Sequence, residues 1–360
     1  MRLLIVIDDP QLPSSRVSAL QYVELLKASG WDVDVFALRD PGMLARQERV
    51  RHVTRRFRVS RVGVSLADRI SRRHEEELIA RAKSADVIYV VKAPHLRILE
   101  RLAAIATAKL LFHISDAFWL PFLQRHGWGS VQQMLELVDG VTTTNEYTAE
   151  RVRLYNRNVF VVPDCPQVED FDLQRQATRK DADEVIVGWI GTPLTATALF
   201  RIWEPLERLA EERSGWSLRL VGVGSEQLVN VPRFEKVRWS SRAWYDRREM
   251  IEEVLAMEIG LFPMYRGEDA LARGALKAAI YMSGEAAVVA QRYGEVQDFV
   301  QDGVNGMLAD SDEEWVEKIA YLIDHAEERR VIAAQGLATV RERFSRAATF
   351  EHLRHAVDSV

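Results

Sequence analysis

The sequence predicts an α/β protein with two doubly wound domains, each a parallel sheet covered by helices. Three observations lead to this fold class. Short continuous apolar runs, typical of buried parallel strands, alternate along the chain with segments whose apolar residues have helical spacing. The 360 residues are too many for one core of ordinary size. A charged stretch without periodicity, Pro163 to Lys180, lies near the middle of the chain and is interpreted as the linker.

Composition and charge are those of a soluble globular protein. Hydrophobic residues make up 48% of the chain and charged residues 28%, and the formal net charge of -5 does not indicate a polyanionic partner. Cys165 is the single cysteine, so no internal disulfide can form and a reducing compartment, the cytoplasm, is expected. The first residues, MRLLIVIDDP, are too short an apolar run for a signal peptide, and no window approaches the ~20 apolar residues of a membrane span.

The first domain opens with a strand, helix and strand. Leu3 to Ile7 is a continuous apolar run, and a loop follows from Asp8 to Ser15. Val17 to Ser29 has helical spacing and ends before a glycine that fits a helix C-terminus, and Asp32 to Leu38 forms the second strand. The Gly-x-Gly-x-x-Gly pattern of dinucleotide sites is missing from this unit, so no nicotinamide or flavin site is expected.

Four more strands are predicted in the first domain, at Val87 to Val91, Leu110 to Ile114, Gly140 to Thr143 and Val159 to Val162. Ligands of doubly wound sheets bind at the carboxyl ends of the strands. This rule selects Lys92, His113, Ser115, Asp116 and Asn145. A histidine at a strand end is more often a structural hydrogen-bonding group, and Asn145 is equally suited to cap the helix that follows it.

The segment from Arg46 to Arg73 is unusually basic. Between Met43 and Arg73 ten arginines stand against only two acidic residues, and three apolar residues among them share one helical face. Such a segment can lie on an anionic bilayer, and we prefer this interpretation to binding of nucleic acid. A solvated arm, or an arm that pairs with another subunit, is the alternative, and the sequence does not define the oligomeric state.

The second domain begins at the strand VIVGWI from Val185. The loop that follows contains Gly191, Thr192 and Thr195, whose backbone and hydroxyl groups could contact phosphate oxygens or cap the next helix. Further strands are expected at Leu218 to Val223 and Ile259 to Phe262. The residues from Trp239 to Tyr245 are expected to form a loop, where an aromatic ring could stack on a base, although packing is the more common role of Trp.

The part of the sequence with the clearest ligand chemistry follows Ile259 to Phe262. It contains a polar loop from Tyr265 to Arg273, a short helix from Ala275 to Met282 and an apolar run from Ala286 to Ala290. The N-terminus of a helix offers free amides and a partial positive charge to an anion. Arg273 and Lys277, four residues apart, add full charges to the same face. This arrangement predicts a diphosphate site.

The same region carries a resemblance to a known family. The run LKAAIYMSGEAAVVA and the run GEVQDFVQDGVNGML together resemble the donor-binding half of GT-B glycosyltransferases of the family 4 type, with Asp298 in place of the usual glutamate. Four other stretches are similar to segments of that family: SSRVSALQYVELLKASGWDVDVF, LLFHISDAFW, TTTNEYTAERVRLYN and GWIGTPLT.

The resemblance implies the GT-B fold and a sugar transfer. The expected domains are residues 1–168 with a crossing helix at 344–360, which bind the acceptor, and residues 169–343, which bind the donor. The donor is a nucleotide-diphosphate sugar, which is a co-substrate, so no cofactor is expected. The acceptor is a lipid-linked saccharide, a polysaccharide or a small metabolite. Retention of anomeric configuration follows from the family, and no metal is expected.

The resemblance also assigns roles to individual residues. The catalytic candidates are Arg273, Lys277, His113 and Asp116. The donor-binding candidates are Gly191, Thr192, Thr195, Glu268 and Glu295. The substrate-binding candidates are Ser14, Ser15, Arg16 and Asn145. For Ser14 to Arg16 the alternative is a capping serine beside a solvated arginine, and for Glu295 it is a solvated loop glutamate.

The sequence departs from the family at the paired glutamates of the donor helix. If the Tyr-Met match sets the register, their positions are Ala272 and Ile280, unless a shifted loop gives the first role to Glu268. A lysine–cysteine pair of one subgroup is also missing, and Arg273 could substitute for it. Two alternatives to a transferase therefore stay open: a non-catalytic relative that binds a membrane or a partner, and a nucleotide-sugar epimerase. The expected location is the cytoplasm, peripheral to the inner face of the membrane.

Overall fold

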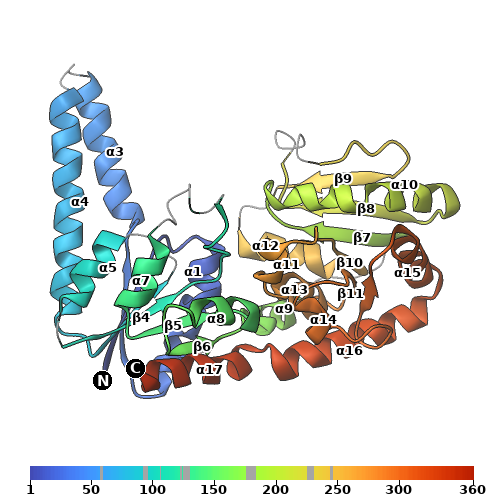
Figure 1. Ribbon diagram of the computed structural model, residues 1–360. Coiled ribbons are helices and arrows are strands. Elements are labelled where there is room, and N and C mark those ends of the chain that lie inside the picture. Colours follow the sequence, from blue (N-terminus) through green and yellow to red (C-terminus); the bar gives the residue numbers. More distant parts are fainter. Residues whose placement is uncertain are drawn as a thin grey trace. The chain divides into compact units, whose positions relative to one another are not determined.

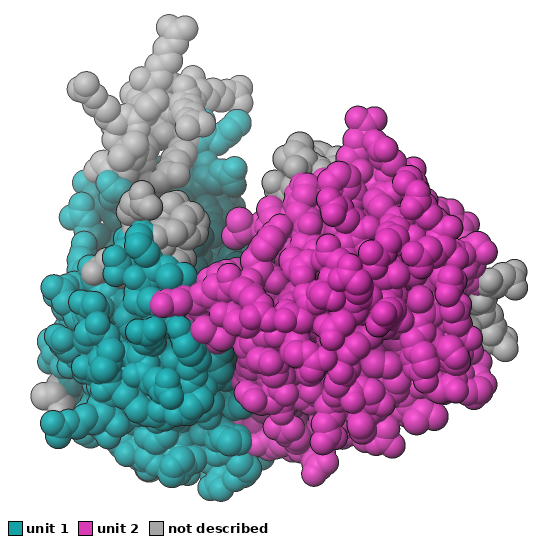
Figure 2. All heavy atoms as spheres, turned by 45° about the vertical axis from the view of Figure 1, so that its right-hand side comes forward, with its two compact units in different colours: residues 1–163, 350–360 teal, residues 164–349 magenta. Residues whose placement is uncertain are grey.

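The chain folds into two compact units, seen in a computed structural model (Figure 1). Unit 1 comprises residues 1–163 and 350–360, and unit 2 comprises residues 164–349; Figure 2 gives each its own colour. The structure describes residues 1–56, 60–91, 96–105, 107–121, 124, 130–175, 184–224, 231–243 and 246–360. Each unit is described by itself.

Unit 1 is a parallel sheet with its connecting helices. Its described elements before the chain leaves the unit are β1 (Arg2–Ile7), α1 (Pro13–Ser18), η1 (Leu20–Tyr22), α2 (Val23–Ala28), β2 (Asp32–Ala37), α3 (Pro41–Arg56), α4 (Ser60–Ala82), β3 (Val87–Val91), α5 (Leu96–Ala103), β4 (Lys109–His113), α7 (Val131–Leu137), β5 (Gly140–Thr143), α8 (Glu146–Val152) and β6 (Val159–Val161). The strand order is β2-β1-β3-β4-β5-β6, and every described pair is parallel.

The burial of these strands explains their sequences. β3 is buried along its whole length and reads VIYVV, as expected for a strand covered on both faces. β2 lies at the sheet edge, and its alternating DVDVFA leaves it only partly buried. Two helices, α3 and α4, pack against each other and project from the sheet as a hairpin (Figure 1).

Unit 2 repeats this architecture. Its described elements are α9 (Val168–Arg175), β7 (Val185–Ile190), η3 (Thr195–Arg201), α10 (Trp203–Glu212), β8 (Trp216–Val221), β9 (Trp239–Arg242), α11 (Arg247–Leu255), β10 (Ile259–Phe262), α12 (Glu268–Leu271), α13 (Leu276–Ser283), β11 (Ala287–Gln291), α14 (Val296–Phe299), β12 (Met307–Ala309), α15 (Asp312–Asp324) and α16 (Ala326–Arg343). The strand order, β12-β11-β10-β7-β8-β9, reverses direction at β7, so β7 and β10 flank the switch point where ligands bind in such sheets. The predicted pair of doubly wound parallel sheets is confirmed.

The last helix, α17 (Arg346–Ser359), returns to unit 1 as predicted for residues 344–360. The ring of Phe350 stacks on that of Tyr22 with 6.3 Å between centroids, and the indole N–H of Trp31 donates to Asp358 at 3.3 Å. The two ends of the chain therefore share one core.

Two predicted irregular segments are ordered elements instead. The linker contains α9, because Val168 and Phe171 are buried and Asp170 forms an ion pair with Arg247 at 2.7 Å. The predicted loop at Trp239 begins with β9, which extends the sheet as its edge strand, where partial burial is enough to hold a polar sequence. Trp244 and Tyr245, at the end of that prediction, lie outside the described residues.

Two helix boundaries also differ from the prediction. The helix expected from Val17 to Ser29 begins at Pro13, a residue that suits a first helical position, and is interrupted where Ala19 leaves helical geometry (φ -143°). The polar loop from Tyr265 to Arg273 contains the single turn α12, whose first residues are acidic and so favour a helix N-terminus.

Candidate functional site

The loop after β7 is closed by a threonine side chain. The Thr195 hydroxyl accepts a hydrogen bond from the Thr192 N–H at 3.0 Å and donates to the Thr192 carbonyl at 3.1 Å. Gly191 has no side chain for a steric reason: a Cβ there would lie 2.3 Å from the Trp189 ring and 2.6 Å from the Thr195 oxygen. The three predicted residues thus form one tight turn at the carboxyl end of β7, with Thr192 exposed.

Lys277 reaches this turn from the first turn of α13. Its Nζ lies 3.4 Å from the Thr195 hydroxyl oxygen and 4.7 Å from the centroid of the Trp189 ring. Lys277 as a whole residue is only partly buried, but its ammonium is enclosed by these groups. Burial, reinforced by the charge of Arg273, lowers the pKa of Lys277 to about 7. A fixed amine therefore joins the two segments that the sequence assigned to a diphosphate.

Tyr281 holds α13 against the ends of β7 and β10. Its hydroxyl donates to the Leu261 carbonyl at 3.0 Å and accepts from the Ile190 N–H at 2.8 Å, and burial raises its pKa. A Cβ on Gly260 would lie 2.3 Å from the Tyr281 ring, so only glycine lets the ring approach β10 this closely. The tyrosine of the YM motif thus sets the position of Lys277, one helical turn before it.

Glu295 is attached to the start of the same helix. Its carboxylate accepts a hydrogen bond from the Ala275 N–H at 2.7 Å. Burial raises the pKa of Glu295 to about 7, the negative charges of Asp164 and Asp298 act in the same direction, and the Ala275 hydrogen bond opposes the rise. Glu295 is therefore not the solvated loop glutamate that the sequence left open. It orders the residues at the start of α13.

Arg273 and Glu268 are the exposed members of the predicted set. Arg273 forms an ion pair with Asp269 at 3.4 Å, and about half of its side chain is accessible. Glu268 is the first residue of α12 and is also exposed. An exposed arginine beside α12 is free to reorient toward a ligand at little cost, since such ion pairs are weak.

The turn from Asp302 to Gly306, part of the family-like run, is a structural feature. The Asn305 side chain accepts from the Gln301 N–H at 2.7 Å and donates to the Phe299 carbonyl at 3.2 Å. Asp302 accepts from Lys318 at 2.7 Å and from Arg292 at 3.0 Å. Although burial opposes it, these hydrogen bonds hold the pKa of Asp302 below its usual value. This motif fixes the strand that follows.

In unit 1, His113 lies at the end of β4 as predicted. It is 1% exposed, and its Nδ1 lies 3.0 Å from the hydroxyl oxygen of Thr142 on β5. The hydroxyl of Tyr89 on β3 lies 3.1 Å from the same oxygen. The three side chains connect three neighbouring strands, so the surroundings of His113 are those of a buried hydrogen-bonding group. A direct role of His113 stays a prediction.

The other candidates of unit 1 lie around the same sheet. Asn145 is buried and caps α8 by accepting from the Thr148 N–H at 2.9 Å, which is the alternative role considered for it. Asp116 is partly buried in the loop after β4, and Ser15 is buried inside α1 between Ser14 and Arg16, which are partly buried. Lys92 lies outside the described residues.

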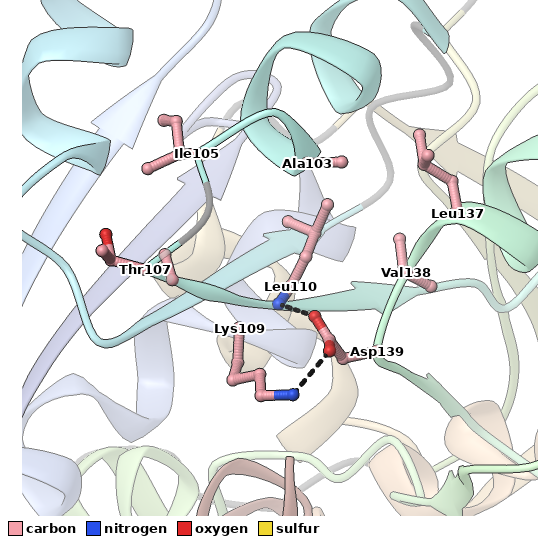
Figure 3. Close-up of a pocket in the computed structure, with 9 residues that line it drawn as sticks. Ala103, Ile105, Thr107, Lys109, Leu110, Leu137, Val138 and Asp139 are labelled. Carbon is pink, nitrogen blue, oxygen red and sulfur yellow. Dashed lines mark hydrogen bonds and ion pairs between the residues drawn. The ribbon is translucent and has the colours of Figure 1, made fainter.

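Unit 1 also has a pocket of about 330 Å³ at the opposite, amino end of β4 (Figure 3). Asp139 lies in it and accepts from the Lys109 ammonium and from the Leu110 N–H, both at 2.8 Å. The remaining lining is mainly apolar. Because these charges satisfy each other and the pocket lies away from the strand ends that bind ligands, it is not part of the candidate site.

Sequence reasoning missed the aromatic and tyrosine partners of the site. Trp189 and Phe262 face the Lys277 ammonium, at 4.7 and 6.0 Å from their ring centroids, and Tyr281 joins three elements. Each of these residues lies in an apolar run, where an aromatic side chain is ordinarily part of the core. The one available signal was the position of Trp189, two residues before the glycine of the loop.

Comparison with known proteins identifies the family. A family model described as a glycosyl transferase 4-like domain matches residues 15–165, and one described as glycosyl transferase-like matches residues 201–354. The chain is a glycosyltransferase of the family 4 type. The predicted resemblance and the enzyme class are confirmed. A comparison with functionally curated proteins found no match.

Solved structures share the fold at low sequence identity. Anabaena HepE in complex with UDP-glucose is 15% identical, with 99% of this chain and all of that chain covered and a TM-score of 0.64. Sucrose-phosphate synthase from Thermosynechococcus elongatus is 14% identical over 99% and 98% of the two chains, with a TM-score of 0.64. Trehalose 6-phosphate synthase from Burkholderia multivorans is 12% identical over 99% and 96%, with a TM-score of 0.67. The GT-B fold predicted for this glycosyltransferase is thus confirmed.

Proposed function

We propose that this enzyme transfers a sugar from a nucleotide-diphosphate donor whose diphosphate binds in unit 2, between the Gly191–Thr195 loop and the start of α13. The observation that carries the proposal is the position of Lys277, whose Nζ lies 3.4 Å from the Thr195 hydroxyl. Cleavage of a sugar–diphosphate bond builds negative charge on the leaving group, and fixed cations and helix-terminal amides stabilise it. Lys277, the N–H groups of α13 and the mobile charge of Arg273 supply these groups.

The remaining residues have supporting roles in this proposal. Thr192 and Thr195 contact phosphate oxygens, Glu295 holds the start of α13, and Glu268 lies at the rim of the donor site. His113 and Asp116 serve the acceptor in unit 1. The transfer proceeds with retention and without a metal, since the leaving diphosphate can help to remove the acceptor proton. A uridine nucleotide is the first donor to test, because the HepE structure of similar fold holds UDP-glucose.

We further propose that the α3–α4 hairpin brings the enzyme to an anionic membrane surface, where a lipid-linked saccharide is the acceptor. Five arginines of the hairpin with described side chains are exposed: Arg46, Arg49, Arg69, Arg72 and Arg73. Among the described residues, none of the five has a carboxylate within 4.0 Å. The described part of the chain contains no helix with the length and hydropathy of a membrane span.

A thermal-shift screen tests donor binding. The melting temperature is measured with UDP, GDP, ADP, dTDP and CMP, alone and as sugar conjugates. One diphosphate nucleoside at ~100 times its Kd should add about 2.7 kcal/mol to the free energy of unfolding. The shift should be lost in Lys277→Ala and kept in Lys236→Ala, an exposed lysine of unit 2 that pairs with Glu211.

Two results would contradict the donor assignment. The first is the absence of a shift with every nucleotide, as expected for a non-catalytic relative. The second is a shift that survives in Lys277→Ala. Turnover of the sugar nucleotide without an acceptor, to an epimeric sugar, would instead indicate an epimerase.

A further inference from the structure

The Lys277 ammonium rests on aromatic rings instead of an acid. The Trp189 centroid lies 4.7 Å from Nζ and the Phe262 centroid 6.0 Å from it. Within the described residues no carboxylate oxygen lies within 4.0 Å of this nitrogen. An aromatic face attracts a cation through its quadrupole but carries no net charge. The rings therefore fix the ammonium without neutralising it.

The loop beside Lys277 is shaped around the Trp189 ring. Trp189 is fully buried in the core of unit 2, one residue before the end of β7. The ring and the Thr195 hydroxyl both occupy the space that a side chain at position 191 would need. Trp189 thus packs against both the loop and the Lys277 amine.

We propose that Trp189 is a positioning residue for the donor: its ring face holds the Lys277 ammonium beside the Gly191 loop with its charge uncompensated, ready for the diphosphate. This inference rests on the proposed function. An acid in the place of Trp189 would have to be displaced, or would repel the arriving anion. The indole avoids both effects and still fixes the direction of the side chain.

Donor binding should change the protonation of Lys277. Arg273 is the charged group whose field acts on Lys277, and Glu295 binds the Ala275 N–H two residues before it. Burial and Arg273 lower the pKa of Lys277 to about 7, so the amine is partly neutral in the free enzyme. A bound diphosphate favours the ammonium, so donor binding at pH 8 should transfer a proton from solvent to Nζ.

Isothermal titration calorimetry with UDP tests the proposal in the intact enzyme and in Trp189→Phe, Trp189→Leu and Lys277→Met. Measurements from pH 6 to 9, in two buffers of different ionisation enthalpy, give the affinity and the protons taken up. The enzyme and Trp189→Phe should take up a fraction of a proton at pH 8. Trp189→Leu should lose affinity for UDP mainly above pH 7. The midpoint of its affinity-against-pH curve should lie about one pH unit lower than that of the enzyme. Lys277→Met should bind weakly and take up no proton at this position.

A uniform loss of affinity at every pH in Trp189→Leu, with an unchanged midpoint, would overturn the proposal, because a purely structural role predicts that result. Circular dichroism shows whether this variant is folded. If this variant is not folded, a pH titration of the enzyme without ligand tests the proposal instead. The fluorescence of Trp189, taken as the difference between the enzyme and Trp189→Phe, should change with a midpoint near pH 7, and the change should vanish in Lys277→Met.

Different results would contradict the donor site and the role of Trp189. An enzyme that binds no UDP and no other diphosphate nucleoside at any pH contradicts the donor site. A fluorescence change that persists in Lys277→Met, or an absent one in the enzyme itself, contradicts the contact between Trp189 and Lys277.

Discussion

Two residues of the candidate donor site, Lys277 and Glu295, are shifted toward their neutral forms. The pKa of Lys277 is lowered to about 7 and that of Glu295 is raised to about 7, in both cases chiefly by burial. Glu295 binds the N–H of Ala275, the residue just before α13, and Lys277 lies in the first turn of that helix. Near neutral pH, small changes in the surroundings therefore change the charge of both groups.

The substitution Glu295→Gln should stabilise the protein above pH 7. The pKa of the carboxyl is higher in the folded state than in the unfolded chain, so its relative contribution to stability is complete below about pH 4 and is lost as pH rises through about 7. The glutamine carbonyl can keep the Ala275 hydrogen bond without a charge. Thermal unfolding should show no difference at pH 4 and a gain on the order of 2 kcal/mol at pH 8. Both proteins contain Lys277, so the effect of its titration on the free energy of unfolding cancels in the comparison. A difference that does not vary with pH would contradict the assigned pKa.

The sequence predicted the identity of many site residues but not their surroundings. Arg273 and Lys277 stand out because they are four residues apart near the start of a helix. Thr195 and Trp189, which contact the Lys277 amine, lie more than 80 positions earlier, and the Ala275 N–H meets a carboxylate 20 positions later. Spacing within one segment carries no information about such contacts. Burial, which sets both pKa values, is a property of the assembled sheet.

Among the elements of unit 1, the α3–α4 hairpin is the one proposed to meet a membrane. It packs helix against helix and projects beyond the sheet (Figure 1). On an anionic surface each arginine contributes on the order of 1 kcal/mol. Replacing the five exposed arginines by glutamine should therefore reduce binding to vesicles that contain phosphatidylglycerol by more than about 100-fold at 0.1 M salt.

Co-sedimentation with vesicles measures this effect. The enzyme should bind anionic vesicles and leave neutral phosphatidylcholine vesicles in the supernatant. The matched control replaces five exposed arginines of unit 2: Arg213, Arg233, Arg238, Arg242 and Arg248. Equal losses in both variants, or a hairpin variant that changes only the oligomeric state in light scattering, would contradict the membrane proposal.

The elements that sequence analysis predicted correctly are those with a strong local pattern. Buried strands such as β3 are continuous apolar runs, and β10 begins and ends as predicted. The missed elements are stabilised from elsewhere in the chain. Arginines of unit 2 hold α9 in place, and β9 is a strand only because β8 offers an edge. Polar segments of this kind have no periodicity that could indicate their structure.

In the molecule as a whole, the two units contain sheets of the same kind, but different groups lie at the carboxyl ends of their strands. The carboxyl ends of β7 and β10 carry a turn, a helix start and a buried amine, which suit a diphosphate. The end of β4 carries His113 within a hydrogen-bonded group of three strands. This difference supports the proposal that the donor binds in unit 2 and the acceptor in unit 1.

Hydrogen–deuterium exchange with and without a saturating uridine diphosphate sugar is the decisive test of a donor site in unit 2. We expect slower exchange at the backbone N–H groups of the Gly191–Thr195 loop and of Gly274 to Ala278, since these groups would contact the diphosphate. The same protection should be absent in Lys277→Ala. Protection confined to unit 1, for example around the Lys109–Asp139 pocket, would contradict the assignment of the donor site to unit 2.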